Sequence, residues 1–475
     1  MKIKALNLYI RLLFPIMFAV LLALEACAAS PLPDPAKLNY PPLQFNLTAA
    51  ERIVLKNGIV LYFLEDRELP LIAVNALIKS GSMYDPAGKA GVAELTAYVL
   101  RTGGTQKLAS SQIDDQFDLL AASPSITAAP DSVQVDFSFL NKDVNQALDL
   151  LAQILRMPAF EETKVNLAKG LKSEELRRLK DDPQGLAFRE FNRLIYRDNP
   201  RGRFISSKSL KNIERRDLVT FHQKYFQPQN IMFAVTGDIS REEAIDKLQK
   251  YFGDWPSGGK PVIPPEPPSS SPGGLFYINK DIPQSTIISG QFAPAKIDPD
   301  YYAFAVLDFI LGSGGFTSRI FSAVRSSEGL AYSAGSFYRA RPDHGVFAAY
   351  AFTKTESTFQ TLSLINAAIN SVCDKTITAG EIQWAKNSIN NGFIFSFTSP
   401  QQIAWQQMKL EYDGLPTDFL SSYRDKINNV KIEDLNAIAV KYLKKNNNTL
   451  ILGNTGKFGE LSAGVGRPVL ITPEE

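Results

Sequence analysis

The stretch AGVAELTAYVLRTGGT, from Ala90 to Thr105, has the pattern of a short amphipathic helix. Apolar residues recur in it at helical spacing, so they would share one face that packs on a core. Gly91 precedes the pattern, and Gly103 and Gly104 follow it, as glycine commonly does just beyond a helix. The spacing therefore predicts a helix between Gly91 and Gly103. Its apolar face would consist of Val92, Leu95 and Val99.

The surrounding sequence contains strands as well as helices. Apolar and polar residues alternate from Val133 to Phe139, which is typical of a half-buried strand. The segment NGIVLYFLED begins at Asn57-Gly58, a turn signal, and predicts a strand that pairs with the apolar run Leu71–Gly81. Helical spacing returns in residues 144–155 and 161–179. Grouped strands and grouped helices predict an α+β fold, in which an antiparallel sheet carries helices on one face.

The chain repeats itself once at long range. PQGLAF at Pro183–Phe188 returns as PQQIAW at Pro400–Trp405, and DLVTFHQKY at Asp217–Tyr225 returns as DLNAIAVKY at Asp434–Tyr442. Both pairs are 217 residues apart. Several matches at one offset indicate a duplicated domain. Further matches are Ala168-Lys169 with Ala385-Lys386, and RTGG ending at Gly104 with GSGG ending at Gly315.

A segment rich in proline, glycine and serine separates the two halves. Residues 254–274 read DWPSGGKPVIPPEPPSSSPGG, a composition that suits a linker better than a packed core. We therefore expect residues 45–253 and 275–460 to form two homologous domains.

Residues 1–29 differ in composition from the rest of the chain. Three basic residues precede an apolar run that ends in small residues, which predicts a secretory signal peptide rather than a membrane-spanning helix. Cleavage after Ala28 or Ala29 fits this pattern. The alternative is a bacterial lipoprotein signal, LEAC, with Cys27 as the lipid-bearing residue. Both alternatives predict an exported, periplasmic protein, and the second predicts a lipid anchor.

Composition and charge exclude some classes of protein. A hydrophobic content of 45% and a charged content of 21% are those of a globular protein. Removal of the first 26 residues leaves 48 basic and 48 acidic side chains, from 51 and 49 in the whole chain, because it removes Lys2, Lys4, Arg11 and Glu25. Without a basic surplus we expect no nucleic acid as partner. The remaining cysteine, Cys373, is expected to be a core thiol, so no disulfide forms within the mature chain.

The helix of Ala90–Thr105, the glycines that end it and the duplication resemble the pitrilysin/insulinase family of zinc metallopeptidases, specifically its bacterial members similar to the mitochondrial processing peptidase. The resemblance extends from about Glu51 to about Gly456. It implies two α+β domains that form half of a clamshell. Active members carry an inverted zinc motif, H-x-x-E-H, on this helix: its histidines bind zinc and its glutamate activates water.

The resemblance places other residues at the motif positions of this chain. Glu94 and Tyr98 stand where the two histidines would be, and Ala97 stands where the general base would be. The family's third ligand, a glutamate 77 residues beyond the second histidine, falls on Glu175, for which the alternative is a solvated helix glutamate. Two carboxylates alone suit magnesium or calcium better than tetrahedral zinc. We therefore expect no metal in this chain and no peptide hydrolysis by this chain alone.

The chain has two histidines, His222 in TFHQKYF and His344 in RPDHG. We expect both to be surface or structural residues rather than metal ligands.

In heterodimeric members of this family, one chain carries the zinc motif and the other supplies an arginine and a tyrosine from its second domain. The matching segment here, SRIFSAVRSSEGLAYS, contains Arg325 and Tyr332 at the family's R-x6-Y spacing. The resemblance implies that these two residues bind the substrate carbonyl in trans. A guanidinium is always charged, and a phenol hydroxyl can donate to the oxygen that becomes negative. Tyr338 and Arg339 are nearby alternatives. Three preceding glycines would let a partner or peptide approach the backbone: Gly312, Gly314 and Gly315.

These inferences predict a catalytically inactive subunit of a heterodimeric zinc metalloendopeptidase, with zinc in the partner subunit. The two chains would enclose a chamber, which short unfolded peptides would enter to add a strand to a sheet edge beside the zinc. The alternative is a non-enzymatic periplasmic peptide-binding or scaffold protein of the same fold. A third and disfavoured interpretation is a self-sufficient peptidase with an altered metal site.

Overall fold

The computed structural model of the protein describes residues 48–258, 262–263, 265–266, 268, 273–374, 376–444, 447–458 and 468–473. The predicted signal peptide and Cys27 lie outside these residues. None of the helices within the described ranges combines the length and the hydropathy that crossing a bilayer requires.

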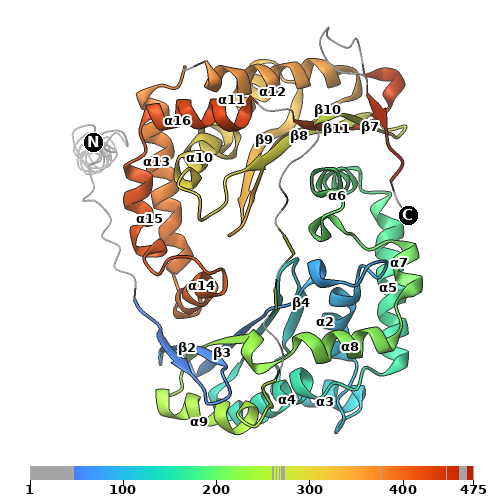
Figure 1. Ribbon diagram of the computed structural model, residues 1–475, viewed down its shortest axis with the longest axis vertical. Coiled ribbons are helices and arrows are strands. Elements are labelled where there is room, and N and C mark those ends of the chain that lie inside the picture. The colour runs from blue at the N-terminus through green and yellow to red at the C-terminus, as the bar shows by residue number, and fades with distance from the viewer. Residues whose placement is uncertain are drawn as a thin grey trace, which may run out of the picture. The chain divides into compact units, whose positions relative to one another are not determined.

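The first sheet is built by the N-terminal half (Figure 1). The parallel pairing of β2 with β6 makes it a mixed sheet, since the other neighbours are antiparallel. The predicted pairing of the segment after Asn57-Gly58 with Leu71–Gly81 is wrong: β6 lies between β2 and β3, and the turn at Gly58, with φ +92°, joins β1 to β2. In spatial order the strands are β1 (Glu51–Val54), β2 (Val60–Glu65), β6 (Ile231–Gly237), β3 (Leu71–Ile78), β5 (Val133–Leu140) and β4 (Ser125–Ala128).

Helices of the same half cover one face of this sheet. The alternation in β5 buries Val133, Val135, Phe137 and Phe139, as predicted, and these side chains join the core beneath the helices. The helices predicted at 144–155 and 161–179 are α4 (Val144–Arg156) and α5 (Glu162–Leu179). The others in this layer are α2 (Val92–Thr102), α3 (Ser110–Leu120), α8 (Arg215–Tyr225) and α9 (Arg241–Phe252).

The C-terminal half repeats this arrangement around a second sheet (Figure 1). It too is mixed, because β7 runs parallel to both of its neighbours. Cys373 is buried in this half, as predicted, and its Sγ lies 3.5 Å from the Ala439 carbonyl oxygen. The strand order is β12 (Val469–Leu470), β7 (Gly274–Asn279), β11 (Asn448–Gly453), β8 (Gln284–Ala293), β10 (Gly345–Lys354) and β9 (Ala331–Ala340). Its helices include α10 (Tyr301–Asp308), α12 (Thr358–Cys373), α13 (Ala379–Ile394), α15 (Phe419–Asn428) and α16 (Ile432–Ile438).

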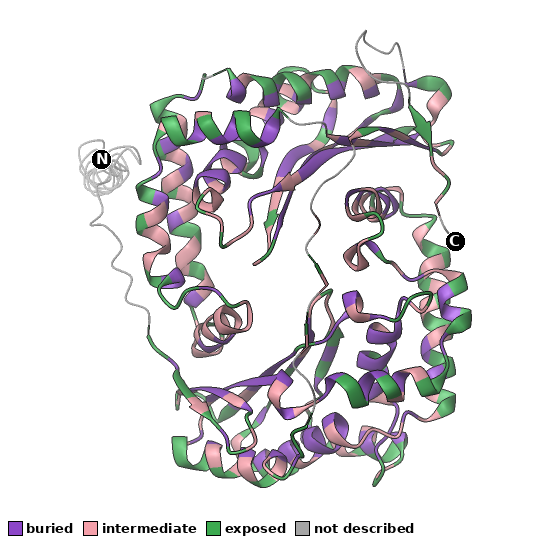
Figure 2. Cartoon of the chain, in the orientation of Figure 1, coloured by how far each residue is buried: buried purple, intermediate pink, exposed green. Residues whose placement is uncertain are grey.

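The two halves exchange one helix each. Helix α6 (Pro183–Tyr196) belongs to the first half but packs on the second sheet, and α14 (Pro400–Tyr412) belongs to the second half but packs on the first sheet. Because successive strand residues face opposite sides, Leu61 packs under its own helices while Tyr62 packs on α14. The central strands of each sheet are therefore buried on both faces, as the purple strands of Figure 2 show, whereas the edge strands β1, β4 and β12 keep exposed residues.

The exchanged helices contain one pair of the repeated segments that the sequence shows. PQGLAF and PQQIAW are their first turns, and each helix begins at its proline after an Asp182 or Ser399 cap. The lysines of the matched pairs Ala168-Lys169 and Ala385-Lys386 also make equivalent contacts. Lys169 Nζ donates to the Ile213 carbonyl, and Lys386 Nζ donates to the Asn428 carbonyl. The shared contacts support the duplication by geometry as well as by sequence.

The α+β class with two similar sheets is confirmed. We expected antiparallel sheets, but each sheet contains a parallel pair. Each pair forms because β6 or β11 joins its sheet only after a long run of helices. Trp255 lies within the range predicted as a linker, yet its indole packs in the first core beside Arg156. Residues 47–475 group as one compact unit, which follows from the helix exchange.

Candidate functional site

Helix α2 has the bounds that its sequence predicts. It begins after Gly91, whose φ of +112° disfavours other residues, and its C-cap Gly103 donates its N–H to the Val99 carbonyl. The buried carboxylate of Asp85 accepts the backbone N–H groups of Gly91 and Ala93, at 2.7 and 2.8 Å. Asp85 thus fixes the start of the helix on which the motif positions lie.

The carboxyl of Asp85 makes stability depend on pH. Burial raises its pKa from 3.8 to about 7, although its two backbone donors act in the opposite direction. A carboxyl with a raised pKa binds its proton more tightly in the folded state than in the unfolded state. Its protonation therefore contributes to the free energy of unfolding in full below pH 4, and this contribution is lost as pH rises to about 7. Between pH 4 and pH 7.5 the ionisation of Asp85 should cost the wild type up to ~4 kcal/mol of its free energy of unfolding. Asparagine does not ionise, so the Asp85→Asn variant should not show this loss.

Urea unfolding at both pH values measures this difference. Equal pH dependence in the two proteins would contradict the assignment. The matched control is Asp66→Asn, a substitution of another aspartate of the first half in the loop after β2.

The motif position Glu94 is occupied by an ion pair. One of its carboxylate oxygens lies 2.8 Å from the ammonium of Lys172, on α5, and the same ammonium lies 2.8 Å from Glu175. The structure therefore brings Glu94 and Glu175 to one place, with a lysine cation between them. Burial opposes the charge of Lys172, but its hydrogen bonds to Glu175 and Glu94 prevail and raise its pKa.

The other two motif positions supply nothing to a metal. Ala97 is only 1% exposed and places a methyl group in the core, so it has no group that could accept a proton. Tyr98 is 41% exposed, and its backbone carbonyl accepts from Thr102. Within the part of the chain that the structure describes, no three His, Cys, Asp or Glu side chains gather as a metal would require. This donor set does not fit tetrahedral zinc, which favours histidine and cysteine ligands.

Both histidines are used in the fold. His222 Nε2 lies 2.8 Å from the Leu155 carbonyl, and burial lowers its pKa to about 4, so it is neutral at pH 7. His344 lies between the Tyr196 hydroxyl, at 2.9 Å, and the Asp343 carboxylate, at 2.6 Å. These contacts hold both rings away from Glu94 and Glu175.

The Glu94–Lys172 pair is expected to contribute modestly to stability. A double-mutant cycle with Glu94→Gln, Lys172→Met and both should give a coupling of about 0.5–1 kcal/mol, because both side chains are partly exposed. Chemical unfolding of the four proteins measures it. The Glu174–Arg177 pair on the exposed side of the same helix offers a matched cycle with a smaller expected coupling. A coupling near zero for Glu94–Lys172 would show that the ammonium is not held between the carboxylates.

Arg325 and Tyr332 lie side by side on the second domain. The π-helical turn η8 (Ser322–Ser327) carries Arg325, and β9 begins just before Tyr332. The guanidinium carbon lies 5.0 Å from the centroids of both the Tyr332 and the Phe321 rings. Tyr332 is 82% exposed, and no described carboxylate is paired with Arg325. The pair therefore presents a free positive charge and a free hydroxyl to the surface.

The three glycines before this pair have a different role from the predicted one. A Cβ at Gly312 would lie 2.2 Å from the Ser336 backbone, and one at Gly314 would lie 2.4 Å from the Trp384 ring. Both glycines are required by packing within this chain, rather than by a partner or peptide. Gly315 differs, because its φ of +76° alone explains it. The alternative residue Tyr338 is committed to the fold, since its hydroxyl donates to the Pro294 carbonyl at 2.6 Å.

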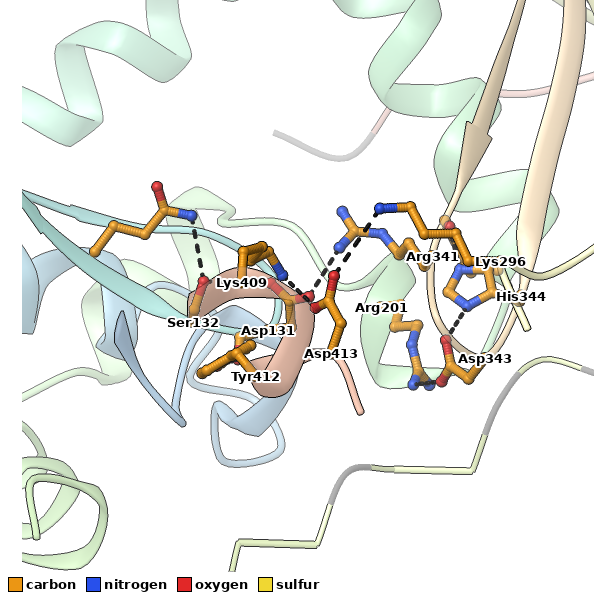
Figure 3. A network of polar contacts seen from close by, with 12 residues as sticks. Asp131, Ser132, Arg201, Lys296, Arg341, Asp343, His344, Lys409, Tyr412 and Asp413 are labelled. Atoms are coloured by element: carbon orange, nitrogen blue, oxygen red, sulfur yellow. Dashed lines mark hydrogen bonds and ion pairs between the residues drawn. The ribbon is translucent and has the colours of Figure 1, made fainter. Parts of the chain in front are cut away.

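A cavity of about 450 Å³ lies where Glu94 faces the second domain. Residues of both domains line it, and ion pairs join them across it (Figure 3). Asp131 pairs with Arg341 at 3.1 Å and accepts the Tyr412 hydroxyl at its carbonyl, while Arg201 pairs with Asp343 at 2.5 Å. These contacts fix the two domains around the cavity.

Sequence reasoning missed Lys172 and this cavity. Lys172 lies 78 positions from Glu94, and neither residue carries a local signal of the other. Likewise, Arg201 comes from the turn at Pro200–Gly202, whereas Arg341 and Asp343 come from the loop between β9 and β10, about 140 residues later. A single sequence shows which side chains are charged, but the pairing of distant charges depends on the packed fold.

Two family models match this chain, one described as insulinase (peptidase family M16), over residues 65–208, and one described as the peptidase M16 inactive domain, over residues 212–389. Two similar proteins are both named as uncharacterized zinc proteases. One, from Rickettsia bellii, is 28% identical over 302 residues, which is 63% of this chain and 72% of the relative. The other, from Mycobacterium leprae, is 24% identical over 386 residues, 80% of this chain and 86% of the relative.

Solved structures show the same fold. A peptidase M16 inactive domain from Pseudomonas fluorescens has a TM-score of 0.78 and 25% identity, and covers 86% of this chain and 98% of its own. A protease from Helicobacter pylori has a TM-score of 0.77 and 22% identity, over 86% of this chain and 100% of its own. The chain therefore belongs to the insulinase (M16) peptidase family, with an insulinase-type domain followed by a domain of the inactive type.

Proposed function

We propose that this chain is the non-catalytic subunit of a heterodimeric zinc metalloendopeptidase. The observation that carries the proposal is the Arg325–Tyr332 pair, in which a partly buried guanidinium lies beside an exposed tyrosine. It coexists with a lysine ammonium, Lys172 on α5, that stands between Glu94, at a predicted histidine position on α2, and Glu175, at the predicted position of the third ligand. A chain of this family whose motif positions do not fit zinc, yet which presents these two groups, is suited to complete the site of another chain.

The two groups have separate tasks in this proposal. When bound in the partner subunit, zinc supplies the activated water. Arg325 binds the scissile carbonyl from this chain's side, and the Tyr332 hydroxyl donates to the oxygen that gains negative charge. Preorganised donors of this kind are each worth ~3 kcal/mol in acyl-transfer transition states. The three aromatic rings around Arg325 hold the guanidinium in place before substrate binds.

Peptides would bind by adding a strand to an exposed sheet edge. In the described structure β4 pairs only with β5, and β9 pairs only with β10, so each has one free edge. Backbone hydrogen bonds along such an edge recognise an unfolded peptide with little dependence on its side chains. A short unfolded peptide is therefore the proposed substrate class.

The N-terminal segment suggests where the complex works. We propose export to the periplasm, with either cleavage after residues 28–29 or lipid attachment at Cys27. Metabolic labelling with a fatty acid, in the wild type and in Cys27→Ser, distinguishes the two.

Native mass and zinc content test the proposal directly. The tagged mature protein is purified gently from its own cells. One zinc in a complex of about twice the monomer mass, with a different second chain, supports the non-catalytic subunit. A zinc-free monomer or homodimer favours the peptide-binding or scaffold alternative, and one zinc per copy of this chain contradicts both.

The alternative rests on a separate observation, the cavity within this one chain. A protein that only binds peptides would need such a cavity and would not need the exposed pair. Under this alternative, substitution of Arg325 or Tyr332 changes no activity of any complex.

A further inference from the structure

We propose that the cavity between the two domains of this chain binds a short peptide by its carboxylate group, either an acidic side chain or the C-terminus. The inference rests on the proposed function only in taking a peptide as the ligand. It goes beyond that function because it assigns a binding site inside this chain, apart from the Arg325–Tyr332 pair.

Three cations line the cavity without an ion pair within 4.0 Å among the described residues: Lys79, Arg203 and Arg339. Their contacts are weak ones. Lys79 Nζ lies 5.9 Å from the Tyr412 ring centroid, and the Arg339 guanidinium carbon lies 4.8 Å from the Phe337 ring centroid. Arg203 donates a long hydrogen bond to the Asp85 carbonyl, at 3.4 Å, and its charge acts only weakly on the buried Asp85 carboxyl. All three side chains are exposed to the cavity solvent and free to take an anion.

The carboxylates of the cavity are already neutralised, so they do not offset these three cations. Figure 3 shows most of these pairs. Glu94 and Asp413 pair with cations that lie outside the cavity lining. These two carboxylates therefore do not neutralise the cations of the lining, which keeps a net positive charge. The pairs are Asp131 with Arg341, Asp343 with Arg201, Glu94 with Lys172, and Asp413 with Lys296 and Lys409.

The remaining wall is apolar and aromatic. A volume of about 450 Å³ lies within the range typical of ligand sites, which combine apolar walls with a few polar anchors. Such walls select a carboxylate carried on an organic group over a hydrated inorganic anion, because the apolar part gains from burial. The residues of this wall include Met83, Tyr84, Tyr196, Phe204, Phe337 and Tyr412.

The cavity and the exposed pair are separate sites on the same strand. Arg339 and Tyr332 are seven residues apart in β9, which corresponds to ~23 Å along an extended strand. A loss of binding in the cavity can therefore be separated from a loss of function at Arg325 and Tyr332.

Calorimetric titration of the full chain, in the assembly in which it purifies, tests the inference. The probes are an N-acetylated tripeptide of alanine, phenylalanine and alanine with a free C-terminus, its C-terminal amide, and an amidated tripeptide with glutamate in the last position. We expect the free acid or the glutamate amide, or both, to bind about tenfold more tightly than the neutral amide. The two acidic probes distinguish the C-terminal carboxylate from the side-chain carboxylate. Inorganic phosphate serves as the small-anion control.

The double variant Lys79→Gln, Arg339→Gln should abolish the preference for the acidic probes. The control Arg216→Gln, which removes an exposed arginine of the first domain outside the cavity, should retain it. Equal binding of acid and neutral amide, no binding of any probe, phosphate binding as tightly as the peptides, or a preference that survives the double variant would overturn the inference. Failure of the proposed subunit role leaves these results unchanged, because the titration requires no cleavage.

Discussion

Replacement of Arg325 by alanine is expected to lower peptide cleavage by the heterodimeric complex about 10²–10³-fold, while the complex keeps its zinc. The physical reason is that, in the proposed role, Arg325 contributes a fixed positive charge at the substrate carbonyl and does not contact the metal. The guanidinium is partly exposed and its ring contacts are with Phe316, Phe321 and Tyr332, so we expect its removal to leave the fold intact. The effect is measured as kcat and kcat/KM of the purified complex on a short fluorogenic peptide.

The way the two constants change identifies the role of Arg325. A loss of an interaction made only in the transition state lowers kcat and kcat/KM together, whereas a loss of ground-state binding raises KM alone. Tyr332→Phe, which removes only the hydroxyl, should show the first pattern. Its effect in combination with Arg325→Ala should be less than additive, because the two groups act on one carbonyl.

The control for this experiment is Arg178→Ala, since Arg178 is an exposed arginine on α5 that pairs with Glu174. It should leave the kinetics unchanged. Unchanged cleavage in Arg325→Ala, or loss of zinc or of the partner from that variant, would contradict the role assigned to Arg325.

The Phe191→Ala variant is expected to lose about 3–5 kcal/mol of stability, which is a large part of the 5–15 kcal/mol of an ordinary domain. Phe191 is fully buried on α6, where the helix of the first half packs on the second sheet against Ile288, Val346 and Leu450. Truncation removes apolar burial and leaves a cavity at this junction. Because α6 joins the two domains, the loss should also weaken their coupled unfolding.

Scanning calorimetry and urea unfolding measure both effects. We expect a lower midpoint and a transition that broadens or divides in two, since domains that no longer stabilise each other unfold separately. Phe395→Ala, at a phenylalanine that is 73% exposed, is the matched control and should shift the midpoint little. A change below about 1 kcal/mol in Phe191→Ala would show that the exchanged helix is not required for stability.

The correct predictions about the fold were those that depended on local sequence patterns. The helix between Gly91 and Gly103 and the strand from Val133 to Phe139 depend on spacings of a few residues, and both are present. The prediction that Glu94, Ala97 and Tyr98 replace the zinc motif is also local. It needed only the identity of three side chains and the bounds of one helix.

Distant pairings were beyond the reach of one sequence. The predicted pairing of the strand after Gly58 with Leu71–Gly81 failed because β6, more than 150 residues later, inserts between those strands. The turn signal at Asn57-Gly58 was correct, but it specified only that the chain turns and not which strand it meets. Register and neighbour choice are set by the packing of the whole sheet.

The sequence by itself determined the α+β class, the duplication, the main helices and the absence of histidine from the helix Val92–Thr102. These follow from composition, spacing and residue type, which act within a few residues of chain or between repeats that can be compared letter by letter. The tertiary structure alone decided that α6 and α14 exchange sheets, that the Lys172 ammonium stands between Glu94 and Glu175, and that three cations face one cavity. Each of these depends on which apolar faces bury each other, and burial is a property of the folded chain as a whole.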